Sequence, residues 1–395
     1  MRRTILFASA VAALALGIAC GERASRVAEP TAPSLALSDP DRLLSMSPAS
    51  ATIPIRGTVW INASAPPPAV ARRIQWWTSD RAVATVNQNG VVTGLAAGTA
   101  TVFAASGSRR GSAEITVGDP PAPPPGSGDV VLLALGDIAR CSSSGDEATG
   151  VLVDGIPGTI ATLGDNVYFR GTTAEFAECF EPSWGRHKSR IRPAPGNHEY
   201  ETPGAAGYYA YFGAAAGDPD KGYYSYDLGD WHIIALNSSD NCRLIGCAAG
   251  SAQEQWLRAD LAANARPCTL AYWHHPRFNS GSDHGNSPRT GPLWNALYDG
   301  GADIVLNGHE HVYERFAPQT PAAVADPARG IRQFTVGTGG GSHDVFGSTL
   351  QPNSEARSSD TYGVLKLTLK SNGYDWEFVP VAGKTFTDSG SGACH

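Results

Sequence analysis

The sequence predicts an α/β protein preceded by a smaller all-β domain, and three observations support this order. Short alternating apolar runs with turn residues between them occupy residues 45–118. A stretch rich in proline and glycine follows at residues 119–128. In residues 129–395, apolar runs alternate with helical or irregular stretches, as they do in α/β domains. We therefore expect two folded domains joined by a linker of extended proline residues and a glycine hinge.

Length and charge limit the classes of function. The 395 residues are enough for two or three domains, each with its own core. The formal net charge is −7, and the chain has no long run of Lys or Arg. An extended nucleic-acid footprint is therefore not expected, although metal ions can attract an anion locally against a negative background.

The first twenty residues have the pattern of a signal peptide. Two arginines precede an apolar stretch, residues 5–19, that is too short to span a membrane stably. The sequence Leu-Gly-Ile-Ala-Cys-Gly at residues 16–21 resembles a bacterial lipobox, in which Cys20 would become a lipid-anchored N-terminus. Cleavage after Ala19 by an ordinary signal peptidase is the alternative. Either route predicts an exported protein, as an outer-surface or periplasmic lipoprotein or in secreted form.

Cysteine usage agrees with export. Six cysteines follow Cys20, and an even number in an exported protein indicates disulfides, for which fifteen pairings are open. Cys242 and Cys247 are close enough in sequence to close a small loop, so we expect this pair first. The other four are Cys141, Cys179, Cys268 and Cys394.

Residues 21–44 are rich in Ala, Ser, Pro and charged residues without periodicity, and they predict a flexible tether. The domain after it, residues 45–118, has strand-like runs at residues 58–62, 82–86 and 99–104, the pattern of a small β-sandwich. Trp76 and Trp77 are adjacent, so in a strand one points inward and the other outward.

Residues 83–102, Val-Ala-Thr-Val-Asn-Gln-Asn-Gly-Val-Val-Thr-Gly-Leu-Ala-Ala-Gly-Thr-Ala-Thr-Val, resemble a bacterial Ig-like domain of group 2, and the resemblance covers most of residues 45–118. Asn89-Gly90 predicts a tight hairpin, and Gly94 and Gly98 fit turns that need positive φ. Such domains serve as spacers or contact a cell surface. The spacer role is favoured here, because no cluster of polar or aromatic site residues stands out.

Five short polar blocks run in order through the second domain. Most follow an apolar run that predicts a buried strand, and a helix is expected at residues 253–263. The expected strands are residues 130–135, 159–163, 233–236, 270–273 and 304–306. The blocks are Gly136-Asp137, Gly164-Asp165-Asn166-Val167-Tyr168, Gly196-Asn197-His198-Glu199, His274-His275-Pro276 and Gly308-His309-Glu310-His311. Sites of α/β sheets lie just past the carboxyl ends of strands, and this ligand set suits two adjacent metal ions.

With all five blocks in this order, the chain from Asp129 to about Pro380 resembles a calcineurin-like metallophosphoesterase, and most closely the purple acid phosphatases and their bacterial relatives. The first block lacks the histidine of many superfamily members, and Tyr168 stands three residues after Asp165, where purple acid phosphatases place a tyrosinate. Phenolate suits ferric iron. Ala139 and Ala271 depart from the family pattern without changing a ligand atom. The resemblance implies a two-sheet β-sandwich flanked by helices.

Carried over residue by residue, the resemblance implies two metal ions with Asp165 as the bridging carboxylate. The first ion, Fe(III), would be held by Asp137, Asp165, Tyr168 and His311. The second, Zn, Mn or Fe(II), would be held by Asp165, Asn197, His274 and His309. A hydroxide held at the metal pair would attack the phosphorus of the ester.

Two histidines are candidates for contact with the substrate. His198 stands beside the ligand Asn197 and is the first candidate to protonate the leaving group. His284 resembles a second substrate-side histidine of the family, although an exposed loop histidine is the alternative. His275 and the run Tyr313-Glu314-Arg315 are expected to be supporting residues.

The sequence thus predicts an exported, metal-dependent acid phosphatase that acts on small phosphate monoesters. A phosphodiesterase or nucleotidase with the same metals is the alternative among enzymes. A surface-binding protein that uses the fold only as a scaffold is the alternative of another class.

Overall fold

The computed structural model describes residues 43–53, 58–64, 74–118 and 128–395. The expected signal peptide with Cys20, all but the last two residues of the expected tether, and all of the expected linker except Gly128 lie outside these residues. Among the described residues, no helix is long and apolar enough to cross a membrane.

The described residues of the N-terminal domain form nine strands, as the alternating pattern predicts. Two sheets have the orders β2-β9-β8-β5 and β3-β7-β6, and β1 pairs with β4. The expected strand at residues 58–62 is interrupted at Ile61. The strands are β1 (Ser45–Ser47), β2 (Ser50–Ile53), β3 (Thr58–Trp60), β4 (Asn62–Ser64), β5 (Gln75–Thr78), β6 (Ala84–Val86), β7 (Val91–Gly94), β8 (Gly98–Ser106) and β9 (Arg109–Val117).

Local predictions for this domain are confirmed with one exception. Gly90, in the turn between β6 and β7, has a φ of 82°, and Gly98 also has a positive φ. Gly94 lies within β7 and pairs with Ala84, so the expected turn there is wrong. Trp76 is 9% exposed and Trp77 is 39% exposed, so one ring packs inward and the other faces outward.

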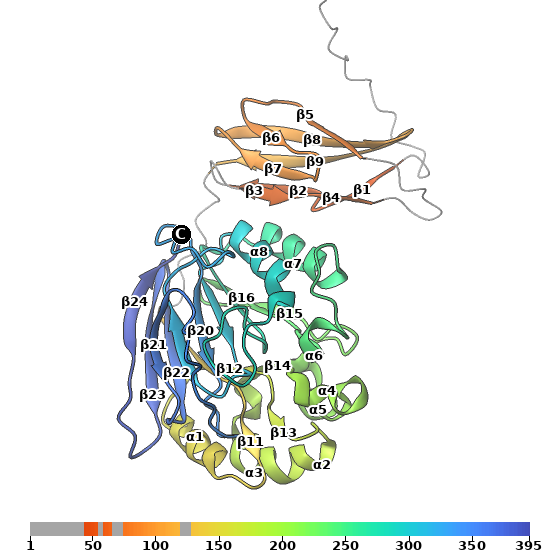
Figure 1. Ribbon diagram of the computed structural model, residues 1–395. Helices are drawn as coiled ribbons and strands as arrows, with labels where there is room; N and C mark the ends of the chain where they lie inside the picture. The colour runs from red at the N-terminus through yellow and green to blue at the C-terminus, as the bar shows by residue number, and fades with distance from the viewer. Residues whose placement is uncertain (1–42, 54–57, 65–73, 119–127) are drawn as a thin grey trace, which may run out of the picture. The chain divides into compact units, whose positions relative to one another are not determined.

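The C-terminal domain contains two large sheets (Figure 1). The six-stranded sheet runs β14 (Ile191–Ala194), β12 (Thr159–Leu163), β10 (Val130–Leu135), β22 (Gly363–Lys370), β23 (Gly373–Pro380) and β24 (Ser389–Ala393). The seven-stranded sheet runs β15 (Tyr224–Leu228), β16 (Trp231–Ala235), β17 (Cys268–Tyr272), β18 (Ile304–Asn307), β20 (Arg332–Val336), β19 (Tyr313–Phe316) and β21 (Ser354–Ser358). A two-residue ladder joins β11 (Ala139–Arg140) to β13 (Val167–Tyr168).

Helices and turns complete this domain. The expected helix at residues 253–263 is confirmed as α7. The longer helices are α1 (Gly145–Asp154), α5 (Ala206–Phe212), α7 (Ala252–Ala263) and α8 (Gly291–Asp299), and the short ones are α2 (Thr173–Glu175), α3 (Glu181–Trp184), α4 (Asn197–Tyr200) and α6 (Ser239–Cys242). Single turns of other helix types are η2 (Phe176–Phe180), η3 (Gly185–Arg190), η4 (Pro203–Ala205), η5 (Gly213–Ala216) and η6 (Pro288–Thr290).

The two sheets share one apolar core. Leu133 of β10 and Leu270 of β17 belong to the same buried cluster, which also includes Val153 of α1. A second cluster joins the other face of β17 to α7 and α8 through Leu257 and Trp294. The domain is therefore a pair of sheets with helices on their outer faces, as expected.

Strand direction brings the expected site residues to one edge. β10, β12 and β14 are parallel neighbours in the first sheet. β17 and β18 are parallel neighbours in the second sheet. Three of the five polar blocks begin directly after β10, β12 and β18, and the other two begin one residue later, after β14 and β17.

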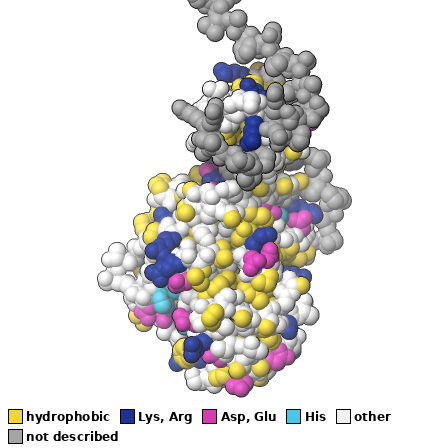
Figure 2. Space-filling model, turned by 90° about the vertical axis from the view of Figure 1, so that its right-hand side faces the viewer, with side chains coloured by type: hydrophobic (Ala, Val, Ile, Leu, Met, Phe, Trp, Pro, Cys, Tyr) yellow, Lys and Arg dark blue, Asp and Glu magenta, His cyan; other side chains and the backbone are white. Residues whose placement is uncertain are grey.

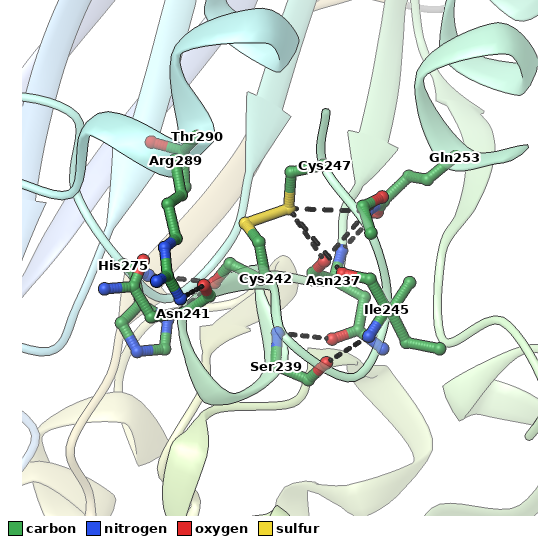
Figure 3. Close-up of a disulfide and its surroundings, with 12 residues drawn as sticks. Asn237, Ser239, Asn241, Cys242, Ile245, Cys247, Gln253, His275, Arg289 and Thr290 are labelled. Carbon is green, nitrogen blue, oxygen red and sulfur yellow. Dashed lines mark hydrogen bonds between the residues drawn. A yellow bond between two sulfur atoms is a disulfide. The ribbon is translucent and has the colours of Figure 1, made fainter. Parts of the chain in front are cut away.

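Six cysteines pair as three disulfides, and the expected bond between Cys242 and Cys247 is one of them. Figure 3 shows this bond closing the loop between β16 and α7, where Ile245 N donates to Ser239 Oγ at 3.0 Å. The other pairs are Cys141–Cys179 and Cys268–Cys394. Disulfides of this kind are typical of oxidising compartments.

Charged side chains of both signs are visible on one face of the molecule. On the face in Figure 2, the Lys and Arg side chains lie among Asp and Glu rather than in a continuous stripe.

Candidate metal centre

Seven side chains that the sequence selects as metal ligands meet at the carboxyl edge of the two sheets. The first sheet supplies residues after β10, β12 and β14, and the second supplies residues after β17 and β18. Tyr168 comes from the short strand β13. In chain order they are Asp137, Asp165, Tyr168, Asn197, His274, His309 and His311.

The four ligands expected for the first metal are in mutual contact. The Tyr168 hydroxyl donates to Asp137 Oδ1 at 2.9 Å and lies 2.9 Å from His311 Nε2. His311 Nε2 also lies 3.4 Å from Asp137 Oδ1. Asp165 Oδ2 is 3.4 Å from the same phenol oxygen. Two carboxylates, a phenol and an imidazole therefore point at one position.

The ligands expected for the second metal surround His274. His274 Nε2 lies 3.1 Å from Asp165 Oδ2, 3.1 Å from Asn197 Oδ1 and 3.2 Å from His309 Nδ1. The ligand atoms of Asp165, His274 and His309 all lie within 4.8 Å of one another. Asp165 Oδ2 contacts both groups, which is the position that a bridging carboxylate needs.

The backbone turns sharply at three of these ligands. Asp137, Asp165 and His309 have φ values of 61°, 48° and 75°. Residues other than glycine rarely adopt this left-handed conformation, and such residues concentrate at functional sites. Each of the three stands within two residues of a strand end, so the turn places its side chain at the sheet edge.

Glycines next to the ligands are required for close approach. A Cβ atom on Gly196 would lie 2.1 Å from Asp165 Oδ1, and one on Gly308 would lie 2.6 Å from Asp137 Oδ2. The structure shows that they let the backbone of one block touch the carboxylate of another.

The charges of the first group fit a cation. Burial, and then the charges of Asp137 and Asp165, raise the pKa of Tyr168 well above its usual value. Burial alone would lower the pKa of His311, but the charge of Asp137 and a hydrogen bond to it outweigh burial and raise the pKa to about 9. The phenol and the imidazole thus keep their protons beside two carboxylates, and a cation between the same atoms would replace both protons.

In the second group the pKa values of the two histidines shift in opposite directions. Burial lowers the pKa of His274, but the nearby charges of Asp165 and Asp137 raise it to about 9. Burial, with the neighbouring histidines, lowers the pKa of His309 well below its usual value. A neutral imidazole and carboxylate oxygens are ligands for Zn, Mn and Fe. The donor set therefore fits two metal ions.

The two expected substrate-side histidines lie next to the ligands. His198 Nδ1 is 2.6 Å from Phe169 O, and His198 Nε2 is 3.8 Å from Asp165 Oδ2. His284 is exposed, and its ring lies 4.2 Å from the ring of His309. The supporting role expected for His275 also agrees with its contacts, because its Nδ1 lies 2.8 Å from Ser238 Oγ.

Sequence reasoning did not assign four residues that hold the candidate ligands or the loop that carries His284. Glu199 accepts from the backbone of the Asp165 block, and Glu310 accepts from the loop that carries His284. His311 Nδ1 lies 2.6 Å from Ser342 Oγ, and His311 N donates to Asp344 Oδ2 at 2.8 Å. Both glutamates stand inside the polar blocks, so their position in the sequence could have indicated a role at the site. Nothing local in the sequence marks Ser342 or Asp344.

The supporting role expected for the run after the last block is visible in its contacts. The Tyr313 hydroxyl donates to Asp388 Oδ2 at 2.7 Å, and Arg315 Nε donates to the same oxygen at 2.6 Å. Glu314 Oε2 accepts from Ser280 N at 2.9 Å. These residues join the ligand strand to neighbouring segments.

Two family models match different parts of the chain. Residues 44–117 match the bacterial Ig-like domain (group 2), and residues 122–313 match the calcineurin-like phosphoesterase family.

Several curated relatives are purple acid phosphatases. Purple acid phosphatase 15 of Arabidopsis thaliana is 27% identical over 47% of this chain and 40% of its own length. Purple acid phosphatase 22 of the same plant is 35% identical over 37% of this chain and 34% of its length. Human acid phosphatase type 7 is 35% identical over 31% of this chain and 32% of its length. The chain thus spans at most about two fifths of these relatives.

Solved structures show the same fold at low sequence identity. A purple acid phosphatase from yellow lupin seeds superposes with a TM-score of 0.56 at 16% identity, over 84% of this chain and 67% of its own. GAP50, described as the anchor in the inner membrane complex of Plasmodium, superposes with a TM-score of 0.52 at 14% identity, over 68% of this chain and 90% of its own. The chain is therefore similar to the bacterial Ig-like domain of group 2 over residues 44–117 and to the calcineurin-like phosphoesterase family over residues 122–313, with purple acid phosphatases among its relatives.

Proposed function

We propose that this protein is a binuclear-metal phosphatase, similar to purple acid phosphatases, that hydrolyses small phosphate monoesters. The observation that carries the proposal is the position of Asp165. Its Oδ2 lies 3.4 Å from the Tyr168 hydroxyl of one ligand group and 3.1 Å from His274 Nε2 of the other. One carboxylate in contact with two complete ligand groups is the arrangement that a metal pair requires.

In this proposal each group holds one ion. Asp137, Asp165, Tyr168 and His311 hold Fe(III), because a phenolate with carboxylates is a hard, anionic set. Asp165, Asn197, His274 and His309 hold a divalent Zn, Mn or Fe ion. When bound, such a pair supplies Lewis-acid neutralisation of phosphoryl oxygens and a lowered pKa for a water molecule.

His198 is proposed to protonate the leaving group. Its Nδ1 faces a backbone carbonyl, Phe169 O, at 2.6 Å, and a carbonyl can only accept. Nδ1 therefore carries a proton in either charge state, so the ionisable proton is the one on Nε2. Nε2 points to the side of Asp165 Oδ2, where the ester would be bound.

His284 is proposed to contact the substrate from the opposite side. It is exposed while its ring packs against the ligand His309 at 4.2 Å. A free loop histidine has no reason to hold this position. A histidine here can donate to a phosphoryl oxygen of a bound ester.

A scaffold role needs a separate argument, because the fold alone does not decide function. GAP50 shares the fold and is described as an anchor. The features that favour an enzyme are local: Asp137, Asp165 and His309 keep an uncommon left-handed backbone with their ligand atoms aimed inward. A scaffold gains nothing from these conformations.

The test is hydrolysis of an aryl phosphate monoester and the matching diester by purified protein, side by side. Faster turnover of the monoester supports the proposal, and a preference for the diester moves the function to a phosphodiesterase or nucleotidase. Loss of turnover in Asp165→Ala ties the activity to the metal centre. Metal-replete protein that hydrolyses neither ester while it binds cell-wall glycan would favour the scaffold.

We also propose export, with a signal peptide at residues 1–20, a tether at 21–44, the Ig-like domain at 45–118, a linker at 119–128 and the catalytic domain at 129–395. The three disulfides support an oxidising compartment. Lipid attachment at Cys20 and contact of the Ig-like domain with the cell surface belong to the same proposal. Radiolabelled fatty acid incorporated into the wild type but not into Cys20→Ser would separate lipidation from simple cleavage.

A further inference from the structure

Glu310 is a fully buried carboxylate between two metal-ligand candidates, His309 and His311, yet its side chain turns away from them. Glu310 Oε2 accepts from Asn279 Nδ2 at 2.7 Å and from His284 N at 3.1 Å. Glu310 Oε1 accepts from Asp283 N at 3.1 Å. A buried charge needs such partners, because water is excluded from it.

All three donors belong to one segment, residues 279–284, which we call the His284 loop. The loop approaches Glu310 so closely that a Cβ atom on Gly281 would lie 1.9 Å from Glu310 Oε1. The loop also closes on itself, since Gly281 N donates to Asn279 Oδ1 at 2.8 Å. It is therefore folded around the carboxylate.

The fold of this loop determines where His284 lies. His284 N donates to Glu310 Oε2, and the His284 ring lies 4.2 Å from the ring of His309 with an interplanar angle of 31°. His309 is the residue just before Glu310, and its Nδ1 points to the second ligand group. In the dipeptide His309-Glu310, the first side chain is thus a candidate metal ligand, and the second holds the loop that carries His284.

We propose that Glu310 is a positioning residue that holds His284 over the metal centre before substrate binds. For its catalytic consequence the inference rests on the proposed phosphatase function. The physical basis is that only a carboxylate can accept from all three donors. An amide at this position would turn an N–H group toward a donor and lose at least one hydrogen bond.

Glu314 provides a matched control. It is also fully buried and lies four residues further along the same segment. Its carboxylate accepts from Ser280 N, near the start of the His284 loop, at 2.9 Å and from Ser354 Oγ. It accepts from neither Asp283 N nor His284 N, which both donate to Glu310. Glu314→Gln therefore removes a nearby buried carboxylate that holds only the start of the loop, and it leaves the contacts of Glu310 to Asp283 and His284 in place.

The first measurement is amide hydrogen exchange of the full-length protein, as purified with its metals, followed by mass spectrometry. In Glu310→Gln we expect exchange across residues 279–284 to speed up by about tenfold or more. Exchange at residues 191–200 should stay at the wild-type rate. Unchanged exchange in the His284 loop would overturn the proposal whether or not the protein is a phosphatase.

The second measurement separates positioning from general damage. We expect Glu310→Gln to lower kcat/KM for an aryl phosphate by about 10- to 100-fold, with the same division between kcat and KM as His284→Ala. The double variant should be no slower than His284→Ala alone, because both changes remove the same function. Glu314→Gln combined with His284→Ala should instead be additive.

Two kinetic outcomes count against the proposal. Additive losses in the Glu310→Gln and His284→Ala pair would show that Glu310 acts through something other than His284. Loss of bound metal from Glu310→Gln, with the loop still protected from exchange, would mean that Glu310 supports its neighbours His309 and His311 rather than His284. If neither wild type nor variants hydrolyse the ester, the proposed function fails. The exchange result still decides whether Glu310 holds the His284 loop.

Discussion

Two buried glutamates organise opposite sides of the candidate metal centre, and they hold different kinds of segment. Glu199 accepts from Asp165 N at 3.0 Å, Asn166 N at 2.8 Å and Gly196 N at 2.6 Å, so it joins two blocks that carry ligands. Glu310 accepts from a loop that carries no ligand and ends at His284. The same chemistry, a carboxylate caged by N–H donors, serves two purposes.

The difference indicates how the site divides its work. On the side of the six-stranded sheet, the carboxylate fixes the backbone of the proposed bridging ligand, so it acts on metal binding. On the side of the seven-stranded sheet, the carboxylate fixes a residue outside the ligand set, so it acts on substrate. Variants of the two glutamates should therefore fail in different measurements.

Removing the shared ligand should have the largest effect, because both groups lose it at once. In Asp165→Ala we expect phosphate-ester hydrolysis to disappear and the metal content to fall, since this carboxylate contacts both groups. Turnover and metal content of the dialysed protein are the measurements. Turnover at the wild-type rate in this variant would show that the activity does not depend on the candidate metal centre, and the comparison of the two glutamates would lose its basis.

Glu199→Gln should weaken metal binding by about 10- to 100-fold, the usual cost of losing a group that orients ligands. Competition with a chelator measures the affinity, and Glu310→Gln is the matched control that should keep its metals. Equal metal loss from both variants would contradict the division of work between the two glutamates. Equal retention, with catalysis impaired in both, would contradict it as well.

The visible spectrum tests the first ligand group alone. If Fe(III) is bound by the Tyr168 phenolate, the wild type should absorb visible light through tyrosinate-to-iron charge transfer, and Tyr168→Phe should lose that band while Glu310→Gln keeps it. Absorption spectra and iron content of the same samples provide the check. A colourless, active wild type without iron would exclude the ferric assignment.

The sequence singled out the seven candidate ligands because their signal is local. Buried parallel strands are continuous apolar runs, so residues 130–135 and 159–163 were expected with the bounds that β10 and β12 have. Ligand types directly after such strands then indicated the site, and the structure brings all seven together. The interruption at Ile61 was missed because an alternating run gives no sign of where pairing changes partner.

The work of Glu199 and Glu310 could not be predicted in the same way. Both stand in the expected blocks, but their partners depend on how loops fold in space. Gly196 becomes a partner of Glu199 only because its block touches Asp165, and residues 279–284 are separated from Glu310 by a helix and a strand. The disulfide Cys268–Cys394 spans 126 residues and is hidden for the same reason.

His232 provides a baseline for these effects, because two carboxylates hold its side chain and it is not one of the candidate metal ligands. His232 in β16 lies between Asp260 Oδ2 at 2.8 Å and Asp227 Oδ1 at 3.0 Å. Burial lowers the pKa of His232, but the hydrogen bonds and charges of both aspartates outweigh burial and raise it above the usual value. The cluster should therefore affect stability and leave metal binding alone.

The sign of its pH dependence follows from that shift. Because the folded-state pKa is raised, the stabilisation is complete below the unfolded-state pKa of about 6.5 and is lost as pH rises through the folded-state value. His232→Gln should cost roughly 1–2 kcal/mol in the free energy of unfolding at pH 6 and less at pH 9. Urea unfolding at both pH values measures this, with metal content unchanged. A cost that grows with pH would mean that the histidine is held in its neutral form. His232 would then not be stabilised by charge, and it could not serve as a baseline for the two glutamates of the site.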